Sequence, residues 1–94
     1  MAKYTVRMEL YGTAPDTTPY RLLHRAMEGN GFTRTIQSSD GLIYRLPTAE
    51  YNFEGDVSGE EVRALAKDAA SQTGRHFGVL VTRAGARWWS GLEE

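Results

Sequence analysis

The chain contains no cysteine, which excludes disulfide bonds, thiolate metal sites and cysteine nucleophiles. It also lacks an excess of charge of either sign, because 11 Lys and Arg are balanced by 12 Asp and Glu, for a net charge of −1. Such a protein has no overall basic field, so any contact with nucleic acid has to come from a local patch. The absence of cysteine fits a cytoplasmic protein, which is the location we expect.

Long apolar runs are missing too. No stretch approaches the roughly 18 apolar residues of a membrane-spanning helix. The N-terminal stretch, MAKYTVRMELYG, alternates apolar and polar residues and lacks the apolar core of a secretory signal peptide. We therefore expect a soluble protein with no membrane partner. A chain of 94 residues predicts one domain, residues 1–94.

Familiar catalytic and cofactor motifs are also absent. There is no P-loop, dinucleotide fingerprint, Gly-x-Ser-x-Gly, His-Glu-x-x-His or EF-hand spacing. The aspartates Asp16, Asp40, Asp56 and Asp68 are isolated along the chain. We expect neither a metal site nor a small-molecule cofactor.

Alternation with a period of two predicts the strands. In the first, residues 3–11, the apolar face carries Tyr4, Val6, Met8 and Leu10. Further strands are predicted at 32–37 and 42–46, joined by the turn SSDG, and at 76–82. RWWSGL, residues 87–92, is interpreted as a short final strand.

Two helices are predicted from their end signals. Thr18 is the expected N-cap of the first, with Pro19 at its first position, and Gly29 or Gly31 ends it. A capping box from Ser58 to Glu61 starts the second, which is rich in alanine and can lie close to a sheet. Gly74 is expected to end it.

The predicted order is β-α-β-β-α-β with an extra C-terminal strand. It is typical of a ferredoxin-like α+β sandwich, in which two helices cover one face of an antiparallel sheet. The other face is expected to be mixed in character and to be solvated, covered by RWWSGL or used for a partner; solvation is the commonest of these. Its expected residues are Thr5, Arg7, Glu9, Thr33, Thr35, Ile43, Arg45, His76, Leu80 and Thr82.

Aromatic residues gather in two further segments. In RLPTAEYNFEGD, residues 45–56, Tyr51 and Phe53 alternate, and we interpret the segment as structural cover, an irregular extension of the third strand. Its acidic residues make it a poor phosphate-binding loop. Trp88 and Trp89 are adjacent, so on a strand they point to opposite faces. We expect one to pack inward and the other to cover the sheet or lie in an interface.

Four segments, MAKYTVRMELYG, AMEGNGFTRTI, YRLPTAEYNFEGD and GVLVTRAGARWW, resemble a family of small proteobacterial and phage proteins. That family is grouped with GhoS, the endoribonuclease antitoxin of the type V toxin–antitoxin system. The resemblance implies a ferredoxin-like, Cas2-like fold and cleavage of a messenger RNA that encodes a membrane toxin. Cas2-like proteins carry an acidic residue at the end of the first strand, whereas here Glu9 lies within it and Asp16 beyond it. This departure argues against metal-dependent cleavage.

Metal-independent cleavage of RNA needs a base for the 2′-hydroxyl, an acid for the leaving oxygen and a cation for the phosphate. The catalytic candidates are His24 and Tyr44. The candidates for binding single-stranded RNA are Arg21, Arg25, Arg34 and Arg45. The residues with the spacing i, i+3, i+4 and i+7 of one outward helix face are Arg21, His24, Arg25 and Glu28. Simple solvation is the plainer interpretation of this face. Arg34 occupies a strand position where an apolar residue is expected.

A second hypothesis belongs to another functional class. The near-neutral charge favours a non-catalytic protein-interaction module of phage or bacterial regulatory origin. Such a module could pair with a second copy through edge strands, giving a homodimer. Single-stranded RNA and a second copy are therefore the two candidate partners.

Overall fold

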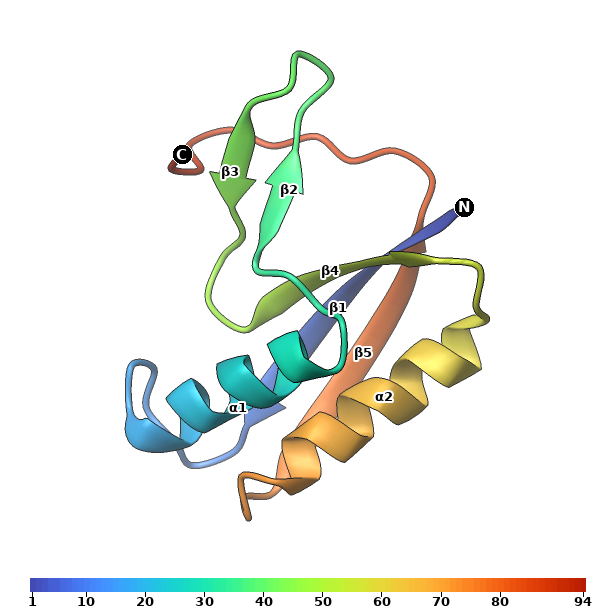
Figure 1. The fold of residues 1–94 in the computed structure, drawn as a ribbon. Helices are drawn as coiled ribbons and strands as arrows, with labels where there is room; N and C mark the ends of the chain where they lie inside the picture. Colours follow the sequence, from blue (N-terminus) through green and yellow to red (C-terminus); the bar gives the residue numbers. More distant parts are fainter.

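The alternating N-terminal stretch forms the centre of the main sheet. We describe all residues, 1–94, from a computed structural model (Figure 1). β1 (Ala2–Leu10) lies between β4 (Glu50–Gly55) and β5 (Phe77–Ala84) and pairs antiparallel with both. β4 and β5 are therefore parallel to each other and are joined through α2 (Gly59–Ser71), which makes a split βαβ unit.

The helices cover one face of this sheet (Figure 1). α1 (Thr18–Gly29) begins after Thr17, one residue before the predicted cap, and Pro19 lies in its first turn. The predicted capping box of α2 is confirmed: Glu61 N donates to Ser58 Oγ over 3.2 Å, and Ser58 N donates to Glu61 Oε1 over 3.4 Å. Neither helix has the length and apolar character needed to cross a membrane.

The core lies between the helices and the sheet. Its members come from β1, α1, α2 and β4, together with Phe32 after α1 and Ala49 before β4. Leu65 and Val79 pack against it, half-buried. The fully buried alanines of α2, Ala66, Ala69 and Ala70, allow its backbone to lie close to its neighbours. The predicted class, an α+β ferredoxin-like sandwich, is confirmed.

β4 is formed by the segment that we interpreted as irregular cover. Tyr51 is opposite Val6 and Phe53 is opposite Tyr4, so both aromatics face the helices, as expected. The segment is nevertheless a regular strand, not an extension of its predecessor. Its alternation matches that of β1, and a turn at Ala49, with a φ of 64°, brings it alongside.

The predicted hairpin exists but stands outside the main sheet. β2 (Thr35–Gln37) and β3 (Ile43–Arg45) pair only with each other (Figure 1). Thr33 alone joins the sheet, exchanging backbone hydrogen bonds of 2.9 and 2.8 Å with Asn52. The chain then bends at Arg34, and the hairpin leaves the plane of the sheet.

The extra C-terminal strand predicted at 87–92 does not form there. After Ala84 the chain forms no strand, and the strand additional to the four of the ferredoxin-like pattern is β3. Residues 85–94, the C-terminal segment, run along the hairpin instead, where Arg45 N donates to Glu93 O over 2.7 Å. One such bond does not make a ladder, because strand pairing needs successive bonds along both backbones.

The C-terminal segment also covers part of the open face. Arg87 Nη1 donates to Asn52 Oδ1 over 2.8 Å and to Thr5 Oγ1 over 3.2 Å. Asn52 is the one buried polar side chain of the protein, and this contact satisfies it. Farther along the face Arg7 and Leu80 remain exposed, so the face is partly covered and partly solvated.

Candidate active site

His24 lies at the border between the buried and exposed sides of α1. The buried stripe of this helix consists of Tyr20, Leu23 and Met27. His24 comes next in sequence after Leu23 and is half-buried. Its Nδ1 atom lies 2.5 Å from the hydroxyl oxygen of Tyr51. Tyr51 comes from β4, where the strand alternation turns its ring toward the helices. The two residues therefore form a hydrogen-bonded pair between α1 and the sheet.

Their surroundings keep both groups neutral. Burial lowers the pKa of His24, the charge of Arg34 lowers it further, and Asp16 acts in the opposite direction. The imidazole is thus mostly unprotonated at neutral pH. Burial raises the pKa of the Tyr51 hydroxyl far above its ordinary value, although Arg34 opposes this, so the hydroxyl keeps its proton.

Arg34 supplies the positive charge near this pair. It lies at the bend between the Thr33 bridge and β2, and its charge acts on both His24 and Tyr51. Its side chain is exposed, and it lines a hollow together with Arg45. The one ion pair of the protein joins the N-terminal amine to Asp56, so no carboxylate pairs with either arginine. The hollow is thus lined by two arginines, Arg34 and Arg45, that have no carboxylate partner.

Aromatic rings hold the pair in place. His24 is 6.3 Å from the ring of Tyr20 and 5.8 Å from that of Tyr51, measured between centroids. Phe32 meets Tyr51 edge-on at 6.4 Å. The Tyr20 hydroxyl accepts a hydrogen bond of 3.0 Å from Leu10 N, so it is engaged with the end of β1. This packing restricts the His24 ring to few orientations.

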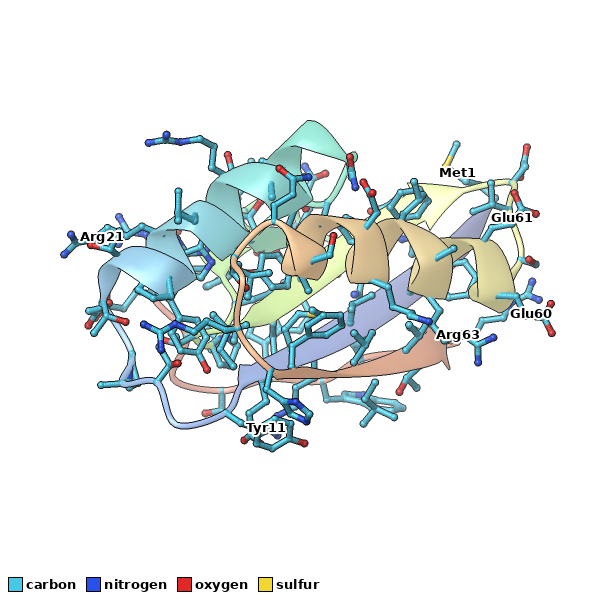
Figure 2. The ribbon with its side chains drawn as sticks, turned by 90° about the horizontal axis from the view of Figure 1, so that it is seen from below. Met1, Tyr11, Arg21, Glu60, Glu61 and Arg63 are labelled. Carbon is cyan, nitrogen blue, oxygen red and sulfur yellow. The ribbon has the colours of Figure 1, made fainter.

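The other predicted residues of α1 do not share the surroundings of His24. Arg21 Nη2 donates to the Asp16 carbonyl over 3.0 Å, and the side chain points away from the molecule at the start of the helix (Figure 2). Arg25 lines a hollow with Gln72, beyond the end of α2. The expected single outward face for Arg21, His24 and Arg25 is therefore wrong, because His24 turns inward to Tyr51.

Tyr44 is the other predicted catalytic residue, and the structure places it against the C-terminal segment. Its ring packs edge-on against Trp89 of the C-terminal segment, with centroids 5.6 Å apart. The hydroxyl that contacts His24 is that of Tyr51, which the sequence indicated only as cover. The alternation of Tyr51 and Phe53 was the available signal, since it turned Tyr51 toward the helices.

The assembled site offers a neutral imidazole, a protonated phenol and unpaired guanidinium groups. It can accept a proton and bind an anion. No three His, Asp or Glu side chains come together as a metal ion would require. Neither a scan against protein-family models nor a search of the curated proteins gives a match for this chain.

Proposed function

We propose that the protein is a GhoS-like, RNA-binding endoribonuclease that acts as an antitoxin by cleaving a toxin-encoding messenger RNA. One observation supports the catalytic part of this proposal: the imidazole of His24 is hydrogen-bonded to Tyr51, and burial and the positive charge of Arg34 lower its pKa. A neutral imidazole is a competent general base near neutral pH. The toxin–antitoxin context comes from the sequence resemblance, and it implies a cytoplasmic site of action.

His24 acts as the base through its outer nitrogen. The reaction uses the tautomer in which Nδ1 carries the proton and donates it to the Tyr51 oxygen, because Nε2 then has a free lone pair. Tyr51 therefore positions the ring, as the partner of a catalytic histidine commonly does. Nε2 accepts the proton of the RNA 2′-hydroxyl.

The rest of the reaction follows without a metal ion. The O2′–P bond forms as the P–O5′ bond breaks, giving a 2′,3′-cyclic phosphate and a free 5′-hydroxyl. The leaving O5′ takes a proton from water, and the proton on His24 is then released to solvent. Arg34, with Arg45 beside it, stabilises the phosphate oxygens as charge develops on them.

The test is incubation of the purified protein with end-labelled single-stranded RNA, with and without EDTA. We expect cleavage in both conditions and a product that ends in a cyclic phosphate. An RNA with 2′-deoxynucleotides throughout is the matched substrate control and should stay intact. Absence of cleavage of any single-stranded RNA by the unmodified protein would overturn the catalytic proposal.

A second candidate function rests on β5. This strand hydrogen-bonds only to β1, so its outer edge is open along its eight residues. Leu80, in its middle, is 61% exposed. Open edges of this kind pair readily with another strand. The alternative proposal is therefore a non-catalytic interaction module that forms a homodimer through β5.

A further inference from the structure

Trp88 has almost no contact with the rest of the protein. It is 89% exposed, more than any other large apolar side chain, including the terminal Met1 at 86%. Its neighbour Trp89 is half-buried against Tyr44. Trp89 is therefore the tryptophan that packs, and Trp88 does not cover the sheet, which leaves a place in an interface as its remaining predicted role. Tryptophan is enriched at binding surfaces, because the indole combines a large apolar area with a polar N–H group.

The hollow beside Trp88 is polar and cationic. It lies between the start of β1, the turn of the hairpin and the C-terminal segment. Lys3, Gln37, Ser38 and Arg87 are among its lining residues. Lys3 is exposed and has no carboxylate in ion-pair distance, since the one ion pair is at the N-terminal amine.

A second hollow lies next to the first, between the hairpin and β4. Its lining includes the hydroxyls and amides of Thr33, Thr35, Gln37 and Asn52, with Glu54. Gln37 lines both hollows, and Arg87 of the first donates to Asn52 of the second. We call the two together the hairpin groove.

We infer that the hairpin groove binds unpaired nucleotides of RNA, with one base stacked on Trp88. The inference rests on the proposed RNA-binding function and adds the place where the strand is held. Bases stack on exposed aromatic rings regardless of sequence, while a nearby cation such as Lys3 contacts the phosphate. The Thr35 and Ser39 hydroxyls make no hydrogen bond within the protein, so they can donate to and accept from a base edge.

The lining favours RNA over a protein partner. Anchor residues of protein interfaces lie in well-packed pockets with little access to water, whereas Trp88 is 89% exposed and lines a hollow with Lys3 and Gln37. Glu54 would repel a phosphate but can accept from a base amino group, so the β4 end of the groove suits bases.

The experiment uses the fluorescence of the two tryptophans. Trp89→Phe leaves Trp88 as the single reporter, and Trp88→Phe leaves Trp89. Each carries His24→Ala so that the RNA stays intact, and each is titrated with a single-stranded RNA of roughly 12 nucleotides, within the usual site sizes. We expect strong quenching of Trp88 and a small change at Trp89. We expect Trp88→Ala to weaken binding about tenfold, a typical loss for one stacked base.

Tyr11→Ala is the matched control, because Tyr11 is also an exposed aromatic, on the side of the sheet away from the helices (Figure 2). Its affinity for RNA should equal that of the unmodified protein. RNA binding with unchanged Trp88 emission and full affinity in Trp88→Ala would overturn the groove and leave the proposed function standing. Absence of RNA binding by the unmodified protein at low salt would overturn both. A blue shift of Trp88 emission with protein concentration, without RNA, would place a second copy there and overturn the groove.

Discussion

The hydroxyl of Tyr51 in β4 lies 2.5 Å from Nδ1 of His24 in α1, across 27 positions of sequence. This contact joins the sheet to the helix layer, and the positive charge of Arg34 lowers the pKa of both residues. The proposed base, its positioning partner and the phosphate-binding cation thus come from three separate elements.

Removing the Tyr51 hydroxyl should change His24 as well as stability. We expect Tyr51→Phe to cost about 1 kcal/mol in the free energy of unfolding, because one hydrogen bond is lost while the ring stays. Cleavage of RNA should fall about tenfold or more, since the imidazole loses its orientation. Urea denaturation and single-turnover cleavage measure the two effects.

Tyr20→Phe is the matched control for that substitution. It removes a hydroxyl that bonds to Leu10 N and not to His24. A similar loss of stability with full cleavage activity is expected. Equal losses of activity in the two variants would contradict the positioning role of Tyr51.

Arg34 should control the protonation of His24. Its charge is one of the causes that lower the pKa of the imidazole, so Arg34→Gln is expected to raise that pKa and Arg34→Lys to leave it lowered. An NMR titration of the His24 ring protons measures this directly. Arg25→Gln is the control, because Arg25 lies toward the end of α2. An unchanged His24 titration in Arg34→Gln would show that Arg34 is too distant to act.

The stability of the protein should depend on pH through His24. The folded-state pKa lies below the ordinary 6.5, so the unfolded chain binds this proton more tightly. The free energy of unfolding should therefore be full above pH 6.5 and decrease as the pH falls from there toward the folded-state pKa. Denaturation curves over this range should show the slope in His76→Gln and lose it in His24→Gln. A slope retained in His24→Gln would assign it to other groups.

Arg87 should hold the C-terminal segment on the sheet. Arg87→Ala leaves the buried Asn52 Oδ1 without its donor, which we expect to cost about 1–3 kcal/mol. Hydrogen exchange at the Arg45 amide, which donates to Glu93 O, should accelerate as the segment detaches. Arg83→Ala, at an exposed arginine of β5, is the control and should change neither quantity. Unaltered exchange in Arg87→Ala would mean that the hairpin contacts alone retain the segment.

Pairing through β5 gives a prediction for the alternative function. If copies associate along this edge, light scattering after gel filtration should give the mass of a dimer, and Leu80→Lys should give a monomer. Ile43→Lys, at an exposed apolar residue of β3, is the control and should leave the dimer intact. A monomer at all concentrations in the unmodified protein would exclude this interface.

Much of the fold was predictable because its signals are local. The alternation of β1, the turn SSDG and the capping box at Ser58 depend on neighbouring residues only, and each is present in the structure. β4 was missed as a strand because no local feature distinguishes irregular cover from a strand that pairs with β1, 43 or more residues earlier in the chain. A strand was predicted in the C-terminal segment for a related reason, because local sequence does not show whether a partner strand lies alongside.

The sequence by itself determined the two helices, the apolar face of the central strand and the supply of a single helix histidine and several arginines. Only the tertiary structure decided which of these meet. It placed Tyr51, not Tyr44, against His24, directed Arg25 toward the end of α2, and left Trp88 in solvent while Trp89 packs. The physical reason is that periodicity fixes the face on which a side chain lies, whereas its partner depends on strand order and on where the hairpin bends out of the sheet.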